Sequence, residues 1–122
     1  MKLCTSAIRV NINLKNGLYR LPCNGGAGKT YLYKILKSLR VSNKNIQCVS
    51  YDSNKEIKDI KDGIVICDRL DMYQSKSLID KLSDIADSNI VLMDIKSLEY
   101  LPDRCVMSCT IKRREGEIDV DC

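Results

Sequence analysis

The residues best suited to chemistry lie in a glycine-rich stretch over residues 21–30, Leu-Pro-Cys-Asn-Gly-Gly-Ala-Gly-Lys-Thr. Gly28, Lys29 and Thr30 fit the end of the pattern G-x-x-x-x-G-K-[ST], and Cys23 occupies the position of its first glycine. In that pattern backbone N–H groups surround phosphates, the lysine reaches the β- and γ-phosphates, and the hydroxyl binds Mg²⁺. The stretch therefore predicts a phosphate-binding loop.

The segments on either side of this loop are expected to be a strand and a helix. Residues 18–21 are predicted to form a central strand, paired in a hairpin with the alternating segment 7–14. Apolar residues at helical spacing predict a helix over 29–40. A helix N-terminus favours bound phosphate through its free N–H groups and partial positive charge. The residues expected to contact the phosphates are Asn24, Gly25, Gly26, Ala27, Gly28, Lys29, Thr30 and Tyr31.

An acidic residue follows a second apolar segment. Residues 64–67, Ile-Val-Ile-Cys, form a continuous apolar run, which predicts a short strand covered on both faces, and Asp68 comes next. Ligands of open parallel sheets lie outside the carboxyl ends of the strands. A carboxylate there can hold the water shell of Mg²⁺, whose other ligands are the Thr30 hydroxyl and the phosphates. Thr30 and Asp68 are therefore the predicted magnesium residues.

The same arrangement recurs further along the chain. Residues 90–93 repeat the buried-strand pattern and are followed by Asp94, with Lys96 two residues later. The end of this strand is expected to face the same cleft. Two interpretations of Asp94 and Lys96 stay open here: they poise a water or sense the γ-phosphate, or they are a strand-end acid and a solvated lysine.

The remaining segments predict an α/β architecture. We expect a strand over 46–51, a helical turn around Ile57 and Ile60, and a helix over 77–87 capped by Ser75. Residues 105–112 are expected to form a last strand, with a short return over 118–120. This alternation predicts an α/β sandwich with a mostly parallel sheet and antiparallel additions at its ends.

Length and composition restrict the class of protein. The 122 residues predict a single domain over 1–122, and the chain has no apolar run long enough for a membrane helix. The net charge of +4 is spread along the chain, so nucleic acid is not an expected partner. The N-terminal residues do not resemble a signal peptide, which predicts a cytoplasmic protein. Several of the seven cysteines lie in apolar strand-like runs, so most are interpreted as small buried hydrophobes. Zinc is not expected, because the chain has no histidine to complete a site.

These motifs resemble the P-loop NTPase superfamily. Gly26-x-Gly28-Lys29-Thr30 is similar to its Walker A motif, residues 64–68 are similar to Walker B, and the resemblance covers nearly the whole chain in element order. The predicted hairpin before the loop and the loop's Asn-Gly-Gly-Ala-Gly-Lys-Thr core look like those of small AAA-type or ABC-type ATPase domains. The resemblance implies a three-layer P-loop sandwich that binds ATP and Mg²⁺ and hydrolyses ATP, with Lys29 and Asp68 as catalytic residues.

The sequence departs from that family at two positions. Cys23 replaces the first glycine, which costs about 1–2 kcal/mol if its φ is positive. Arg69 follows Asp68, whereas the AAA and ABC branch typically has a glutamate there to orient and deprotonate the attacking water. Asp71 or Glu99 is a candidate replacement for that glutamate, and Arg69 is a candidate contact for the γ-phosphate or a partner subunit.

Three functions are therefore open. The first is a weak or partner-stimulated ATPase, in which a second copy or a partner protein supplies an arginine finger such as Arg113 or Arg114. The second is a nucleotide-dependent interaction module that binds ATP without hydrolysing it. The third is a small phosphotransferase similar to nucleoside and nucleotide kinases, in which Arg69 contacts the acceptor.

Overall fold

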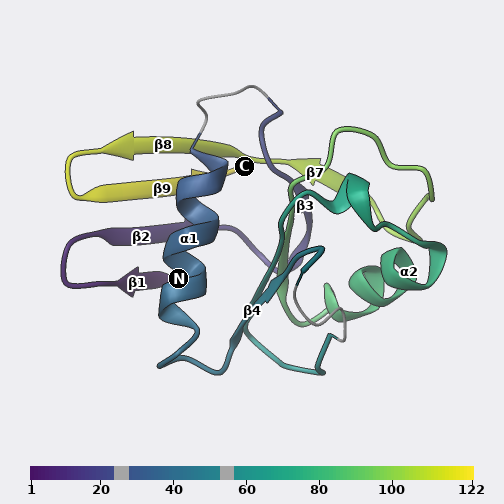
Figure 1. Ribbon diagram of the computed structural model, residues 1–122, viewed down its shortest axis with the longest axis horizontal. Helices are drawn as coiled ribbons and strands as arrows, with labels where there is room; N and C mark the ends of the chain where they lie inside the picture. The colour runs from purple at the N-terminus through teal and green to yellow at the C-terminus, as the bar shows by residue number, and fades with distance from the viewer. Residues whose placement is uncertain (24–27, 53–56) are drawn as a thin grey trace.

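The protein is described here from a computed structural model, which covers residues 1–23, 28–52 and 57–122. These residues form a five-stranded sheet, a four-stranded sheet and two α-helices, so the expected α/β class is confirmed (Figure 1). The elements are β1 (Lys2–Cys4), β2 (Arg9–Asn13), β3 (Gly17–Arg20), α1 (Lys29–Leu39), β4 (Ile46–Val49), β5 (Ile64–Cys67), a 3₁₀ turn η1 (Leu70–Met72), α2 (Lys76–Ile85), β6 (Ile90–Met93), β7 (Val106–Ser108), β8 (Thr110–Arg114) and β9 (Glu117–Asp121). Among the described residues, no helix is long and apolar enough to cross a membrane.

The five-stranded sheet is entirely parallel, in the order β4-β5-β6-β3-β7. Strands β5 and β6 are buried along their whole length, as their continuous apolar sequences predicted. Their side chains alternate between two cores: Ile64 and Ile66 belong to one, and Val65 and Cys67 to the other. The sheet is therefore covered on both faces, and the carboxyl ends of its strands lie at one edge.

The two faces of this sheet are covered differently. On one face, α1 and the four-stranded sheet share a core with it, to which α1 contributes Leu32, Ile35 and Leu36. On the other face, α2 buries Ile79, Leu82 and related side chains against the sheet. Figure 1 shows α1 and the four-stranded sheet on one side of the five-stranded sheet, with α2 on the other side.

Both helices begin close to the predicted positions. The α1 helix begins at Lys29, directly after the glycine-rich stretch, and ends one residue earlier than predicted. The α2 helix spans 76–85 instead of 77–87. Ser75 is its N-cap, as expected, because the Ser75 hydroxyl accepts a hydrogen bond of 3.2 Å from the Leu78 N–H.

The predicted hairpin before the glycine-rich stretch is wrong. Strands β2 and β3 belong to different sheets: β2 pairs with β1 and β9, and β3 lies between β6 and β7. Leu18 and Tyr19 are both buried, on opposite faces of β3, which suits an internal strand of a parallel sheet. The turn before β3 is held by the Tyr19 hydroxyl, which donates to the Lys15 carbonyl at 2.8 Å.

The single strand predicted over 105–112 is two strands in different sheets. Residues 106–108 form β7 beside β3, and residues 110–114 form β8 beside β9. Cys109 lies between them, buried, and its N–H donates to the Arg20 carbonyl at 3.0 Å. The antiparallel pairs therefore form a separate mixed sheet, in the order β1-β2-β9-β8, and are not additions to the parallel one.

The helical turn predicted around Ile57 and Ile60 is absent from the described residues 57–60. Both isoleucines are nevertheless half-buried against the core that α2 covers, as their apolar character predicted. Gln47 holds this segment in place, since its side-chain amide donates to the Lys58 carbonyl at 2.7 Å and accepts from the Lys58 N–H at 2.9 Å.

Candidate functional site

The candidate site begins where the glycine-rich stretch enters α1. Gly28 has φ 92° and ψ 10°, a left-handed conformation that strongly favours glycine, and its carbonyl accepts the Leu32 N–H at 2.9 Å. A Cβ at this position would lie 3.1 Å from Arg113 Cδ. The first turn of the helix has no acidic side chain, so none there neutralises the partial positive charge of its N-terminus.

Lys29 points from this turn to the edge of the parallel sheet. Its Nζ lies 3.0 Å from Oδ1 of Asp94, the residue after β6, and the two side chains are 18% and 20% exposed. The other carboxylate oxygen, Oδ2, accepts the N–H of Arg69 at 3.3 Å. Asp94 therefore links the lysine of the glycine-rich stretch to the residue that follows Asp68.

Asp68 lies at the same edge, directly after β5. Its N–H donates to the Val49 carbonyl at 2.8 Å, and its carbonyl accepts the Tyr73 hydroxyl at 2.7 Å. Burial raises the pKa of the Asp68 carboxyl, and the charge of Asp94 raises that pKa further. The charges of Arg69, Lys29 and Lys37 act in the opposite direction. The structure thus brings Lys29, Asp68 and Asp94 together at one end of the sheet.

Arg69 and Asp71, the other candidate catalytic residues, differ in their surroundings. Arg69 is exposed and has a left-handed backbone, with φ 48° and ψ 54°. Asp71 is bound to the loop after β6, because its two carboxylate oxygens accept the N–H groups of Lys96 and Ser97 at 2.9 and 3.1 Å. The carboxylate of Asp71 therefore anchors the loop next to Asp94.

The remaining predicted phosphate-binding residues are only partly described. Thr30 and Tyr31 are exposed in the first turn of α1, whereas residues 24–27 lie outside the described part of the chain. Cys23 is exposed, and its thiol donates to the Ile95 carbonyl at 3.6 Å. Within the described ranges, positive φ at non-glycine residues occurs at Asp62 and Arg69, so Cys23 does not carry the backbone strain considered from the sequence.

Sequence reasoning did not anticipate the position of Arg113. The sequence suggested Arg113 as an arginine finger for a neighbouring subunit. In the structure it lies next to the candidate site of its own chain. Its guanidinium carbon is 4.3 Å from the centroid of the Tyr31 ring, and its side chain packs against Gly28. No local pattern could have indicated this, because the placement of β8 depends on its pairing with β9 and on the core that its sheet shares with α1.

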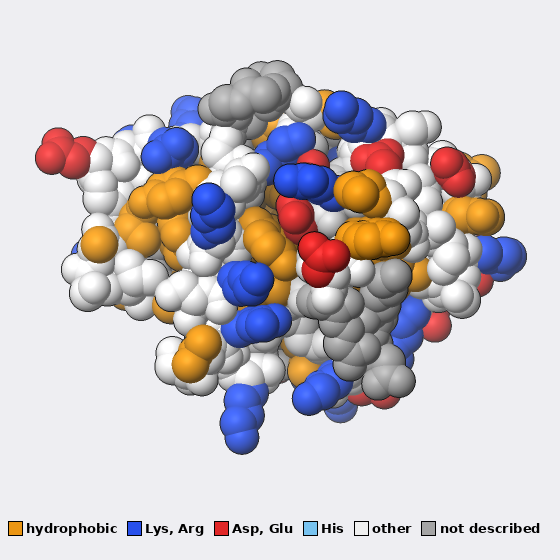
Figure 2. Space-filling view, viewed as in Figure 1, with side chains coloured by type: hydrophobic (Ala, Val, Ile, Leu, Met, Phe, Trp, Pro, Cys, Tyr) orange, Lys and Arg blue, Asp and Glu red, His pale blue; other side chains and the backbone are white. Residues whose placement is uncertain are grey.

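A hollow of about 270 Å³ adjoins Asp68. Two cationic side chains, Lys37 and Arg69, contribute to its wall. Burial raises the pKa of Tyr33, another wall residue, and a side-chain hydrogen bond with Ser50 lowers it in part. In Figure 2, acidic side chains gather with basic ones near the middle of the face shown.

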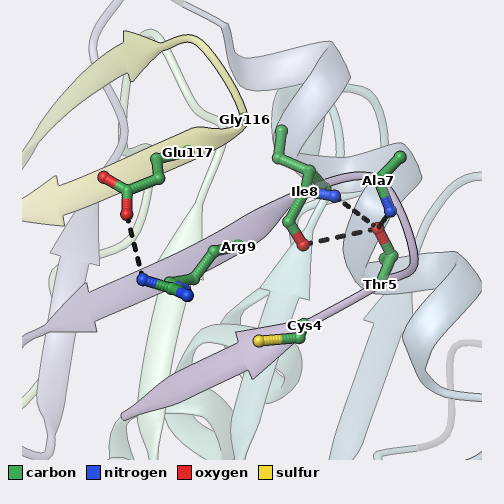
Figure 3. A pocket seen from close by; sticks show the side chains of 7 residues that line it. All are labelled: Cys4, Thr5, Ala7, Ile8, Arg9, Gly116 and Glu117. Atoms are coloured by element: carbon green, nitrogen blue, oxygen red, sulfur yellow. Dashed lines mark hydrogen bonds and ion pairs between the residues drawn. The ribbon is translucent and has the colours of Figure 1, made fainter.

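A second hollow, of about 260 Å³, lies beside the β1–β2 turn and β9 (Figure 3). Its polar groups bind one another. The Thr5 hydroxyl accepts the N–H groups of Ala7 and Ile8 at 3.2 and 3.0 Å, and Arg9 pairs with Glu117 at 3.3 Å. The polar groups of this hollow are thus already bound to one another within the turn and its neighbouring strand. The candidate site therefore remains the start of α1.

Comparison with known proteins does not assign the chain to a family. No protein-family model, curated protein or solved structure matches it. In the described part of the chain, no group of three or more histidine, cysteine, aspartate or glutamate side chains is placed to hold a metal ion. A divalent cation at Asp68 would thus draw most of its ligands from a bound anion and water.

Proposed function

We propose that the chain is an ATP–Mg²⁺-binding P-loop protein that hydrolyses ATP weakly or when a partner stimulates it. The observation that carries the proposal is the 3.0 Å pair between Lys29 and Asp94, formed beside Asp68 at the start of α1. A lysine in the first turn of a helix, next to two carboxylates at the carboxyl edge of a parallel sheet, suits a phosphate anion with its bound cation.

Each residue has a defined role in this proposal. Lys29 exchanges Asp94 for the β- and γ-phosphates, and Asp94 keeps the ammonium group oriented when the site is empty of nucleotide. Thr30 and Asp68 supply oxygen ligands of the kind Mg²⁺ prefers. Bound Mg²⁺ would supply positive charge to the phosphate oxygens. The raised pKa of Asp68 fits this role, because a carboxylate that is costly to ionise gains most from a nearby cation.

A second function, nucleotide binding without hydrolysis, is favoured by the surroundings of Asp71. A water-activating carboxylate needs a free oxygen near the γ-phosphate. Both oxygens of Asp71, the candidate for this role, accept backbone N–H groups. In this alternative the protein signals by its bound state.

The phosphotransferase alternative depends on the hollow beside Asp68. Lys37 and Arg69 line it together with Asp52 and Asp68, and these two cations would contact the phosphate of a phosphorylated acceptor. Release of ADP from ATP only when a nucleoside or nucleotide is added would favour this alternative over the other two.

Calorimetry with ATP, in the presence and absence of Mg²⁺, tests the proposal directly. We expect binding that strengthens with Mg²⁺ and is lost in Lys29→Ala. Lys61→Ala is the matched control, because Lys61 is an exposed lysine before β5, at the amino end of the strand that Asp68 follows. Absence of binding by the wild-type protein would contradict all three functions.

Phosphate release separates hydrolysis from binding alone. We expect slow release by the purified protein at micromolar concentration, abolished by Lys29→Ala. Tight binding without release supports the non-hydrolysing module. Size-exclusion chromatography with and without ATP–Mg²⁺ tests whether nucleotide drives assembly with a second copy.

A further inference from the structure

We propose that Arg113 and Tyr31 form the wall against which the base of the nucleotide stacks, so that the chain completes its own site from the second sheet. The inference rests on the proposed function, since it takes the phosphates to occupy the start of α1. It adds a base-binding surface and a base preference that the sequence did not indicate.

The arrangement of the pair is the first argument. The side-chain stem of Arg113 packs on Gly28, and its guanidinium carbon lies 4.3 Å from the centroid of the Tyr31 ring. Both residues are exposed, with Tyr31 at 37%. A guanidinium that rests on an aromatic ring presents its outer face to solvent as a flat, weakly hydrated cation.

The direction of the phosphates is the second argument. Lys29 points toward Asp94 and Asp68, which belong to the five-stranded sheet. Strand β8, which carries Arg113, passes behind the first turn of α1 in Figure 1, and its Ile111 and Arg113 side chains lie next to Gly28. In this proposal a nucleoside triphosphate bound with its terminal phosphates at the two carboxylates places its base against Arg113 of β8.

The neighbouring arginine shows why Arg113 is suited to this role. Arg114 is held by acidic side chains of β9, Glu117 at 2.9 Å and Asp119. Within residues 1–23, 28–52 and 57–122, no carboxylate pairs with Arg113. As far as the described ranges show, its guanidinium is stacked but not neutralised, so a base that lies on it breaks no ion pair there.

The chemistry predicts which nucleotides bind. Stacking on an aromatic ring or an arginine plane tolerates every base, because each base has a π face, and it favours the larger purines. We therefore expect ATP and GTP to bind with similar dissociation constants and UTP to bind more weakly. If Arg113 stacks on the base in its own chain, it is not available as an arginine finger for a neighbouring subunit.

The experiment compares ATP with inorganic tripolyphosphate, which has the phosphates but no base, by calorimetry in the presence of Mg²⁺. In Arg113→Gln we expect the dissociation constant for ATP to rise by about 5- to 100-fold. That for tripolyphosphate should change less than about twofold. Arg114→Gln is the matched control and should leave both constants unchanged. Tyr31→Ala should resemble Arg113→Gln, whereas Tyr31→Phe should retain ATP binding.

The outcomes separate this inference from the proposed function. Equal weakening of both ligands in Arg113→Gln would make Arg113 a phosphate contact and overturn the base-stacking role. Unchanged ATP binding in both Arg113→Gln and Tyr31→Ala would also overturn it, while leaving the proposed function intact. If the wild-type protein bound neither ligand, the proposed function and this inference would both fall. The Tyr31 variants keep the test valid if Arg113→Gln fails to fold.

Discussion

Lys29 Nζ lies 3.0 Å from Asp94 Oδ1, and this pair brings the first residue of α1 to the end of β6. The pair joins two elements on opposite sides of the site, and Asp68 lies close enough for the charges of both residues to change its pKa. The ammonium group of Lys29 thus interacts electrostatically with both carboxylates, Asp94 and Asp68. The consequences for stability can be measured without any ligand.

Replacing Lys29 with alanine is expected to destabilise the ligand-free protein. The change leaves Asp94 and Asp68 without this cation, so their mutual repulsion grows. We expect the free energy of unfolding at pH 7 to fall by about 1–2 kcal/mol in urea titrations. The loss should be smaller at a pH low enough to protonate these carboxyls. A loss that does not depend on pH would contradict the electrostatic explanation.

Asp68→Asn should have the opposite effect on the ligand-free protein. Because the pKa of Asp68 is raised in the native state, the native protein holds this proton more tightly than the unfolded chain. Its contribution to stability is therefore present at low pH and is lost as pH rises through the raised pKa. The variant should be at least as stable as wild type at neutral pH, but should lose the stabilisation that ATP–Mg²⁺ gives.

Thermal unfolding with and without ATP–Mg²⁺ measures both effects of Asp68→Asn. Asp84→Asn serves as the control, since Asp84 is an exposed carboxylate on α2, away from the site. A ligand-free Asp68→Asn protein that is clearly less stable at neutral pH would contradict the assigned cause of the pKa shift.

The two left-handed glycines Gly28 and Gly116 offer a comparison of strain with and without a close neighbour. An added Cβ at Gly28, φ 92°, meets Arg113 Cδ at 3.1 Å, whereas one at Gly116, φ 72°, has no neighbour within 4 Å. Both alanine variants should lose about 1–2 kcal/mol to backbone strain. Gly28→Ala should lose more, and Arg113→Ala should relieve part of that excess. Equal losses at the two positions would show that the side chain of Arg113 yields freely.

The seven cysteines should divide into two classes of reactivity. Cys48, Cys67 and Cys109 are buried, and burial raises the pKa of Cys48 and of Cys109 to about 11, which leaves little thiolate at neutral pH. The exposed thiols are those of Cys4, Cys23, Cys105 and Cys122. Ellman's reagent should therefore modify four thiols quickly in native protein and the other three only after unfolding.

Modification at Cys23 should also report on ligand binding. In a variant that keeps Cys23 as its one exposed cysteine, ATP–Mg²⁺ should slow labelling by a maleimide, because this thiol adjoins the glycine-rich stretch. The same experiment with Cys105 retained instead provides the control, and its labelling rate should not change with nucleotide.

Local sequence patterns predicted those parts of the fold that depend on nearby residues. The four-residue apolar runs at 64–67 and 90–93 indicated strands buried on both faces, and Ser75 indicated the start of α2; the structure has all three. Lys29 and Asp68 were predicted as site residues from short local motifs, and the structure brings the two side chains to the same end of the parallel sheet. Each of these features is specified by residues that are close together in the chain.

The features that were missed depend on residues far apart in the chain. Segments 9–13 and 17–20 have patterns that suit a hairpin, but the parallel pairings with β9 and β6 take these strands to different sheets. Cys109 gives no local sign that the chain changes sheets there. The position of Arg113 beside Gly28 and Tyr31 could not be predicted for the same reason, because it depends on the second sheet.

The pairing of β2 with β9 also has a consequence for how fast the protein folds. Asn11 and Asp119 are partners in this ladder, joined by a 2.7 Å hydrogen bond, and they are 108 residues apart in sequence. Closing so long a loop costs chain entropy before any contact repays it, and folding dominated by such contacts is slow. We therefore expect folding to be slow, and Arg113 to reach Tyr31 only once the ladder between β2 and β9 has formed.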